Sequence, residues 1–273
     1  MTLHKTAALS LILVLSFAVP GFSQNLKGWV PAPSSKDNAG LWTCAGYGGS
    51  WEVSEHQGRI AVTDYDPEKQ AEAALPAQVK LSKEMIGTRT VLRTMDGWLV
   101  GFDGGEFGGG LWWFSRNGQD IKKLPTNNVH AIFKTPDGIF VLEGIAHLSL
   151  DTGAIDRFIE TPDEISLQFV ANLKGSPEAS TVRSDGQIVV ATMHSVLLVD
   201  HFGHVNEIYK SGEDLVYPTS VVVDGQGNIF VAMRFFVLQL VPNNGRYDPQ
   251  WLMPGKCRSV KQVNYRCVCT AKD

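Results

Sequence analysis

A glycine turn followed by an apolar strand recurs along most of the chain, and this repeat constrains the fold more than any other feature. The anchoring glycines lie 39 to 48 residues apart and are Gly58, Gly97, Gly138, Gly186 and Gly227. Glycine, often with Asp before it, suits the positive φ of a tight hairpin turn. A unit of about 40 to 45 residues made of strands and turns has the size of one propeller blade.

A second turn, after a further apolar strand, occurs inside most of these units. The second turns lie at Asn117-Gly118, Asp151–Gly153, Asp200–Gly203 and Asn244-Gly245. The pattern therefore predicts an all-β fold without a helix, a β-propeller of five or six four-stranded blades, as a single domain over residues 24–273. Leu41–Val53 and Ser259–Cys269 both look strand-like, so we expect the two termini to share the closing blade.

The blade phrases resemble those of the NHL and SMP-30/gluconolactonase-like group of β-propellers. Val189-Val190-Ala191 and Phe230-Val231-Ala232 carry the resemblance best. The resemblance covers most of the chain, concerns the fold, and is shared by many propellers. Asn38 and Asn228 are candidates for the Asn ligands that lactonases of this group use. The Glu and Asp positions of those enzymes have no match in this sequence, so no catalytic residue is carried over.

The first 23 residues have the features of a secretory signal peptide. Lys5 precedes an almost wholly apolar run from Ala7 to Val19, which Pro20 ends, and Gly21 and Ser23 are small. This pattern is typical of a cleaved signal, so we expect a periplasmic or extracellular protein; the alternative is an uncleaved anchor. The chain contains no N-x-[ST] glycosylation sequence, which favours a bacterial envelope or secreted protein.

The cysteines support export, because an even number in an exported chain suggests disulfides. They are Cys44, Cys257, Cys267 and Cys269. Cys267 and Cys269 are two residues apart, which makes them awkward partners for each other. We therefore expect one of them to pair with Cys44 and the other with Cys257. A zinc site is the alternative, although this spacing is uncommon for zinc.

The charge distribution argues against nucleic acid as a partner. The formal net charge is −4, the isoelectric point is near 6.0, and no basic run is longer than Lys122-Lys123. Nucleic-acid binding depends on basic groups that neutralise phosphates. After the signal, no stretch is apolar enough for a membrane span.

Acidic residues end the second strand of several units, where propeller loops converge on one mouth of the ring. The predicted mouth residues are Asp64, Asp66, Asp103, Glu106, Glu143, His194 and Arg234. Asp64, Asp103 and Glu143 are candidate Ca²⁺ ligands because Ca²⁺ prefers carboxylate oxygens, and His194 is a candidate base. The alternative is that these acidic residues merely suit turns facing water.

Two further stretches are candidate binding surfaces. A loop with five glycines between Gly104 and Gly110 precedes Trp112 and Trp113, which are candidates for stacking against sugars, and the loop itself suits a lid or a partner contact. Arg234-Phe235-Phe236 has the composition of a protein-binding hot spot. The alternatives are an unstructured hairpin for the first stretch and a Phe turned into the core for the second.

These features favour a non-enzymatic, exported binding module that holds another protein through one face, as an inhibitor or an immunity-type protein. The first alternative is a Ca²⁺-dependent lactonase- or esterase-like hydrolase at the acidic mouth. The second is a cell-wall or sugar binder that uses the Trp pair. We expect no cofactor, with Ca²⁺ as the exception if the hydrolase hypothesis holds.

Overall fold

The computed structural model describes residues 26–67, 73–212, 215–257, 259–263 and 266–270. The predicted signal peptide, residues 1–23, lies outside the described residues. The described chain is nearly all β, as the repeat predicts. None of its helices is long and apolar enough to cross a membrane.

Three consecutive units form four-stranded antiparallel sheets with the strands in sequence order. The first sheet consists of β4 (Thr88–Arg93), β5 (Gly97–Asp103), β6 (Gly109–Ser115) and β7 (Ile121–Leu124). The second consists of β8 (Asn128–Thr135), β9 (Gly138–His147), β10 (Leu150–Glu160) and β11 (Ile165–Leu173). The third consists of β12 (Ala179–Val182), β13 (Ile188–Ala191), β14 (Ser195–Val199) and β15 (Val205–Lys210).

The fourth sheet carries an additional strand from the N-terminal part of the chain. It consists of β16 (Ser220–Val223), β17 (Ile229–Ala232), β18 (Val237–Asn243), β19 (Arg246–Pro254) and, at its outer edge, β1 (Trp29–Pro31). Hairpin turns at Gly186 and Gly227 join the first two strands of the third and fourth sheets, and both glycines have φ +85°, a conformation that favours glycine.

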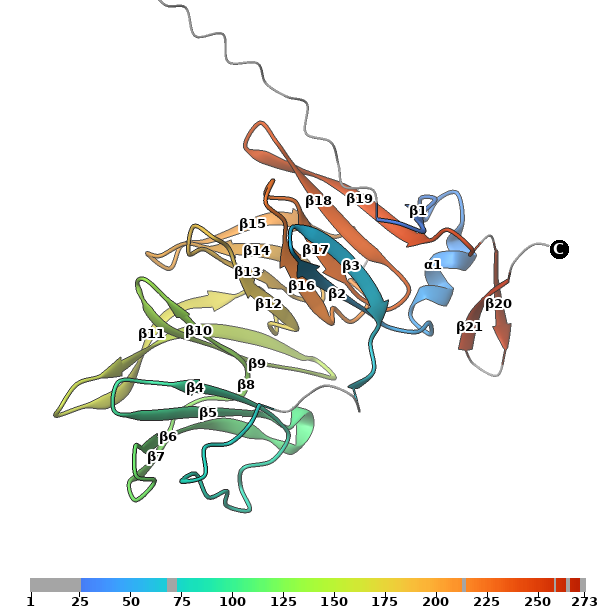
Figure 1. Ribbon diagram of the computed structural model, residues 1–273. Helices are drawn as coiled ribbons and strands as arrows, with labels where there is room; N and C mark the ends of the chain where they lie inside the picture. Colours follow the sequence, from blue (N-terminus) through green and yellow to red (C-terminus); the bar gives the residue numbers. More distant parts are fainter. Residues whose placement is uncertain (1–25, 68–72, 213–214, 258, 264–265, 271–273) are drawn as a thin grey trace, which may run out of the picture.

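The sheets follow one another in space as they do in sequence (Figure 1). β4 contacts β8, β8 contacts β12, and β12 contacts β16, so the first strands of successive sheets lie side by side. This arrangement is compatible with a β-propeller. β13 and β17 are buried along their whole length because both faces of their sheets are covered, which explains their continuous apolar runs.

The unit anchored at Gly58 departs from the expected blade. In the described residues it forms a two-stranded hairpin of β2 (Trp51–His56) and β3 (Arg59–Asp64), and β2 contacts β16. Figure 1 shows this hairpin against the fourth sheet. The blade number predicted from the repeat is therefore not reached by complete four-stranded sheets within the described part of the chain.

The prediction that the chain has no helix was wrong: Leu41–Ala45, expected to be strand-like, is helical, whereas Trp51–Val53 does lie in strand β2. Helix α1 spans Ala39–Ala45, and the Asn38 side chain accepts a hydrogen bond from the backbone N of Leu41 at 3.1 Å. Asn is a favoured N-cap, and Leu41, Cys44 and Ala45 are the buried residues of the helix, at the spacing of one helical face. Asn38 is thus a helix cap.

Within the described residues, Leu41–Val53 and Ser259–Cys269 do not pair with each other to form the shared closing blade that the sequence predicts. β1 pairs with β19, while β20 (Ser259–Val263) and β21 (Arg266–Thr270) form a separate hairpin that contacts α1. A disulfide joins Cys257 to Cys269, which confirms one of the pairs expected from the sequence. Cys44 is also disulfide-bonded, and the side chain of Cys267 lies outside the described residues.

Candidate functional site

Carboxylate–imidazole pairs connect neighbouring sheets at the mouth. Asp103 at the end of β5 places Oδ2 3.2 Å from Nδ1 of His130 in β8. Asp151 in β10 places Oδ2 3.3 Å from Nε2 of His194, which precedes β14. A third pair joins Glu106 Oε2 to His147 Nε2 at 3.3 Å; Glu106 lies in η2 (Gly105–Phe107) and His147 ends β9. Each pair therefore spans two successive sheets.

His130 is held on both sides of its ring. Its Nε2 lies 3.2 Å from Ser176 Oγ and 3.3 Å from the backbone oxygen of Gly144, while its Nδ1 faces Asp103. The order of Ser176, His130 and Asp103 is that of a serine nucleophile, a base and an orienting carboxylate. Ser176 has no exposed surface, so these contacts fix the imidazole and present no nucleophile to a substrate.

Glu178, directly before β12, lies between these pairs. Burial raises the pKa of the Glu178 carboxyl, and the negative charges of Asp103 and Asp151 raise it further. The His130 ring and a hydrogen bond with Ser176 oppose that rise. The cause is desolvation together with like charge, both of which disfavour an ionised carboxyl.

A cavity of about 270 Å³ opens at this point, and we call it the mouth pocket. Its ionisable lining residues are His147, Asp151, Glu178 and His194. Its larger apolar lining residues are Leu148, Leu150, Met193 and Tyr217. Glu178 also lines a second cavity of about 360 Å³, together with His130 and Thr219. Glu178 therefore borders both cavities.

Glu143, predicted for the mouth, lies elsewhere. Strand register pairs Glu143 with Ala154 and Val141 with Asp156, so Glu143 and Asp156 share one face of the second sheet with buried Val141. Burial raises the pKa of Glu143, against a hydrogen bond from the backbone N of Asn127. Asp156 is 7% exposed, and burial together with the Glu143 charge raises its pKa to about 6. We call Glu143 and Asp156 the buried acid pair.

The predicted metal ligands are not brought together. Asp64 is exposed at the end of β3, Asp103 faces His130, and Glu143 belongs to the buried acid pair. In the described ranges, no group of three or more His, Cys, Asp or Glu side chains is placed to hold a metal ion. Asn228 donates from Nδ2 to Asp224 Oδ2 at 2.7 Å, within its own hairpin turn.

The predicted aromatic hot spot was wrong, because Phe235 and Phe236 are both buried. Phe236 packs on Trp42 of α1 with ring centroids 4.6 Å apart, and the backbone N of Phe235 donates to Gly49 at 2.8 Å. Arg234 donates to the backbone oxygen of Gly46 at 2.9 Å. This tip therefore anchors the segment around α1.

The predicted sugar platform was also wrong. Trp112 is buried against Phe102 at 5.5 Å and is covered by the ammonium of Lys123, 5.0 Å from the ring centroid. Trp113 is half-buried, and its Nε1 donates to Glu160 at 3.2 Å. The two rings therefore form no shared exposed surface on which a sugar could stack.

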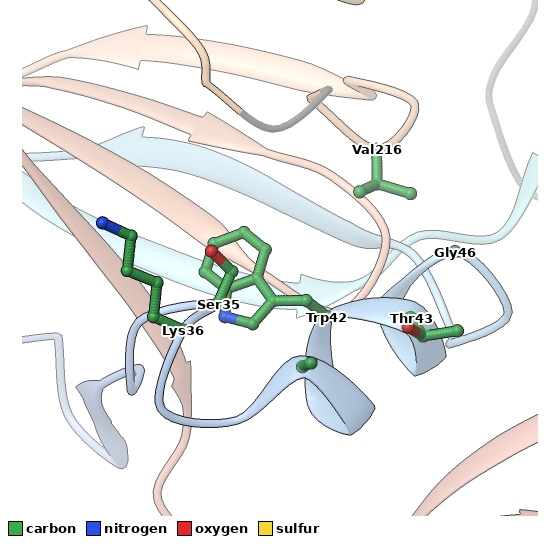
Figure 2. A pocket seen from close by; sticks show the side chains of 7 residues that line it. Ser35, Lys36, Trp42, Thr43, Gly46 and Val216 are labelled. Atoms are coloured by element: carbon green, nitrogen blue, oxygen red, sulfur yellow. The ribbon is translucent and has the colours of Figure 1, made fainter.

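A larger pocket beside α1 lacks comparable chemistry. It has a volume of about 440 Å³ and is lined by Ser35, Lys36, Ala39, Trp42, Thr43, Gly46 and Val216. Figure 2 shows Val216 facing the α1 residues across this pocket. Trp42 Nε1 donates to the backbone oxygen of Pro33 at 3.0 Å. Lys36 is the ionisable group among these lining residues, so the pocket offers mainly apolar surface.

Of the sequence-predicted residues, the structure brings Asp103, Glu106 and His194 to the mouth. Arg234 lies over the ring of Tyr217, 3.8 Å from its centroid. Sequence reasoning missed His130, His147, Asp151 and Glu178. A repeated signal for Glu178 is present in the sequence. Proline followed by a polar residue comes directly before β12, as Pro177-Glu178, and before β16, as Pro218-Thr219. Glu178 and Thr219 line the same cavity.

No family model and no curated protein matches the sequence. A gluconolactonase from Xanthomonas campestris is 12% identical, with 74% of this chain and 67% of that one covered and a TM-score of 0.40. A surface component of the type-IX secretion system of Porphyromonas gingivalis is 10% identical, with 73% of this chain but 33% of that one covered and a TM-score of 0.43.

An auxiliary nutrient binding protein from Bacteroides ovatus is 14% identical, with 56% of this chain and 38% of that one covered and a TM-score of 0.39. The chain thus spans little more than a third of the nutrient binding protein and a third of the secretion component.

Proposed function

We propose that this protein is an exported binding module that holds a cationic amine or guanidinium group in the mouth pocket. The observation that carries the proposal is Glu178, a half-buried carboxyl that lines the mouth pocket together with Asp151. A carboxylate in this position is stabilised most by a nearby positive charge. A ligand cation placed next to Glu178 supplies that charge.

Imidazoles pair with two of the mouth carboxylates. They hold Asp151 and Glu106 in place, so these carboxylates need little reordering when a ligand arrives, and preorganisation of this kind favours binding. The net charge of −4 also favours the approach of a cation. The Cys257–Cys269 disulfide supports an oxidising, exported location.

The proposal is tested by calorimetry on residues 24–273 with the disulfides intact. The probes are N-acetyl-lysine amide, N-acetyl-arginine amide and the uncharged N-acetyl-norleucine amide. We expect the two cations to bind and the norleucine compound not to bind. Glu178→Gln should weaken the cations roughly tenfold or more, because a hydrogen bond to a charged group is worth about 1.5–3 kcal/mol.

Glu84→Gln is the matched control. Glu84 is exposed and pairs with Lys123 at 3.3 Å, away from the mouth pocket lining, so the same substitution there should leave cation affinity unchanged. Equal affinities of Glu178→Gln and Glu84→Gln would refute the proposal. So would binding of the norleucine compound as tightly as the lysine compound.

A further inference from the structure

The mouth pocket has an exposed apolar rim above its charged lining. Leu148 is 94% exposed, Leu150 is 55% exposed and Tyr217 is 49% exposed, and all three line the pocket. Single exposed apolar side chains are ordinary, but several around one cavity are typical of a surface that contacts a partner. A small amine bound beside Glu178 would leave this rim in water.

The backbone at the rim is strained in two places. Leu148 and Tyr217 each have φ +53°, in the left-handed region that side chains other than Gly and Asn rarely adopt. Such residues cost free energy and are concentrated at binding and active sites. Here the strain occurs in two separate loops, after β9 and before β16, and both loops present an apolar side chain at the same pocket.

Tyr217 is fixed before any ligand binds. The Arg234 guanidinium lies over its ring at 3.8 Å, and Arg234 is itself tied to the backbone oxygen of Gly46 at 2.9 Å. A cation over an aromatic face is attractive, so the ring loses little freedom when a partner covers it. Rigid aromatic side chains of this kind serve as anchors in protein interfaces.

We propose that the natural occupant of the mouth pocket is a lysine or arginine side chain of a partner protein, whose neighbouring apolar side chains rest on Leu148 and Tyr217. The proposal rests on the cation site proposed above and adds the class of partner. The complementarity is twofold: the positive group meets Glu178 and Asp151, and the apolar neighbours meet the rim. An interface with an apolar, well-packed surround excludes water from its charged centre.

The test compares two pentapeptides with blocked ends, Gly-Leu-Lys-Leu-Gly and Gly-Ser-Lys-Ser-Gly, by calorimetry on residues 24–273. We expect the leucine peptide to bind about tenfold more tightly than the serine peptide, because its apolar side chains cover the rim. Leu148→Asn should remove most of this preference. Asn tolerates the left-handed conformation, so the loop keeps its shape while the apolar side chain is lost.

Phe202→Asn is the matched control, since Phe202 is 73% exposed and lies outside the mouth pocket lining. This variant should keep the full preference for the leucine peptide. Equal affinities of the two peptides, with N-acetyl-lysine amide still bound, would overturn the partner proposal and leave the cation site standing. Failure of both peptides and of the lysine compound to bind would overturn both proposals.

Discussion

The mouth and the buried acid pair both gather carboxyl groups, but they differ in what faces those groups. At the mouth, Asp103, Glu106 and Asp151 each lie 3.2 to 3.3 Å from an imidazole nitrogen. In the part of the chain that the structure describes, Asp156 has no such partner, and its charged neighbour is Glu143. The mouth therefore pairs its carboxylates with imidazoles, whereas the buried acid pair brings two like groups together, and Asp156 takes up a proton near pH 6.

The largest expected effect concerns Asp156, which we would change to Asn. Burial raises the pKa of Asp156 from 3.8 to about 6 in the folded protein, so the folded state holds this proton more tightly than the unfolded state. The resulting stabilisation is present below about pH 4 and is lost as the pH rises through about 6. A rise of about two units corresponds to about 3 kcal/mol.

Urea unfolding at about pH 4 and about pH 8 measures this effect. Relative to the natural protein, Asp156→Asn should gain up to about 3 kcal/mol of unfolding free energy between the two pH values, because the amide never ionises. Asp163→Asn, at an exposed turn position, is the control and should show no such gain. If Asp156→Asn follows the pH dependence of the natural protein, the pKa of Asp156 is not raised by folding.

Sequence reasoning found the sheets because the repeat is local. Each glycine turn and the apolar strands beside it lie within one unit, and those strands pair with one another in the three four-stranded sheets. The sequence pattern did not predict helix α1, because the helix occurs once and lies outside the repeat. Its signals are present in the sequence, with Asn38 as the cap and Leu41, Cys44 and Ala45 at helical spacing, but a short apolar run of this kind also fits a strand.

The buried tip shows what the repeat cannot reveal. Phe235 and Phe236 are covered by the segment around α1, through the hydrogen bond to Gly49 and the contact with Trp42. That segment is almost 190 residues away in sequence, as the bond from Arg234 to Gly46 illustrates. A hot spot predicted from composition alone is wrong when a segment distant in sequence buries its side chains, as happens here.

The misplaced mouth residue has a simpler cause, the two-residue period of a strand. Asp103 follows its anchor Gly97 by six residues, whereas Glu143 follows Gly138 by five. A shift of one residue moves a side chain to the opposite face. Glu143 therefore joins the buried acid pair, while the position equivalent to Asp103 is Gly144, whose backbone oxygen contacts His130 at 3.3 Å.

A smaller effect is expected in the pH dependence of cation binding at the mouth. Burial and the charges of Asp103 and Asp151 raise the pKa of Glu178, so this carboxyl takes up a proton at a higher pH than an ordinary Glu. Because a cation prefers the ionised form, affinity should fall about tenfold on acidification from about pH 7.5 to about pH 5. The sign is opposite to that for Asp156, where acid stabilises the fold.

Calorimetry with N-acetyl-lysine amide at both pH values checks this, since the lysine ammonium stays charged throughout. Glu178→Gln should flatten the profile, because the amide takes up no proton in this range. An unchanged slope in Glu178→Gln would separate Glu178 from ligand binding.

The smallest expected effect is the response to salt, which should differ between the mouth and the buried acid pair because they differ in exposure to dissolved ions. His194 at the mouth is exposed, whereas Asp156 is 7% exposed, and dissolved salt screens exposed charges far more than buried ones. Raising the salt from about 0.1 M to about 1 M shortens the screening length from about 10 Å to about 3 Å. Affinity for N-acetyl-lysine amide should then fall about threefold, while the pH-dependent stability difference of Asp156→Asn should hardly move. Were both quantities to respond equally to salt, the two sites would share one solvent environment, and the contrast between an exposed mouth and a buried acid pair would fail.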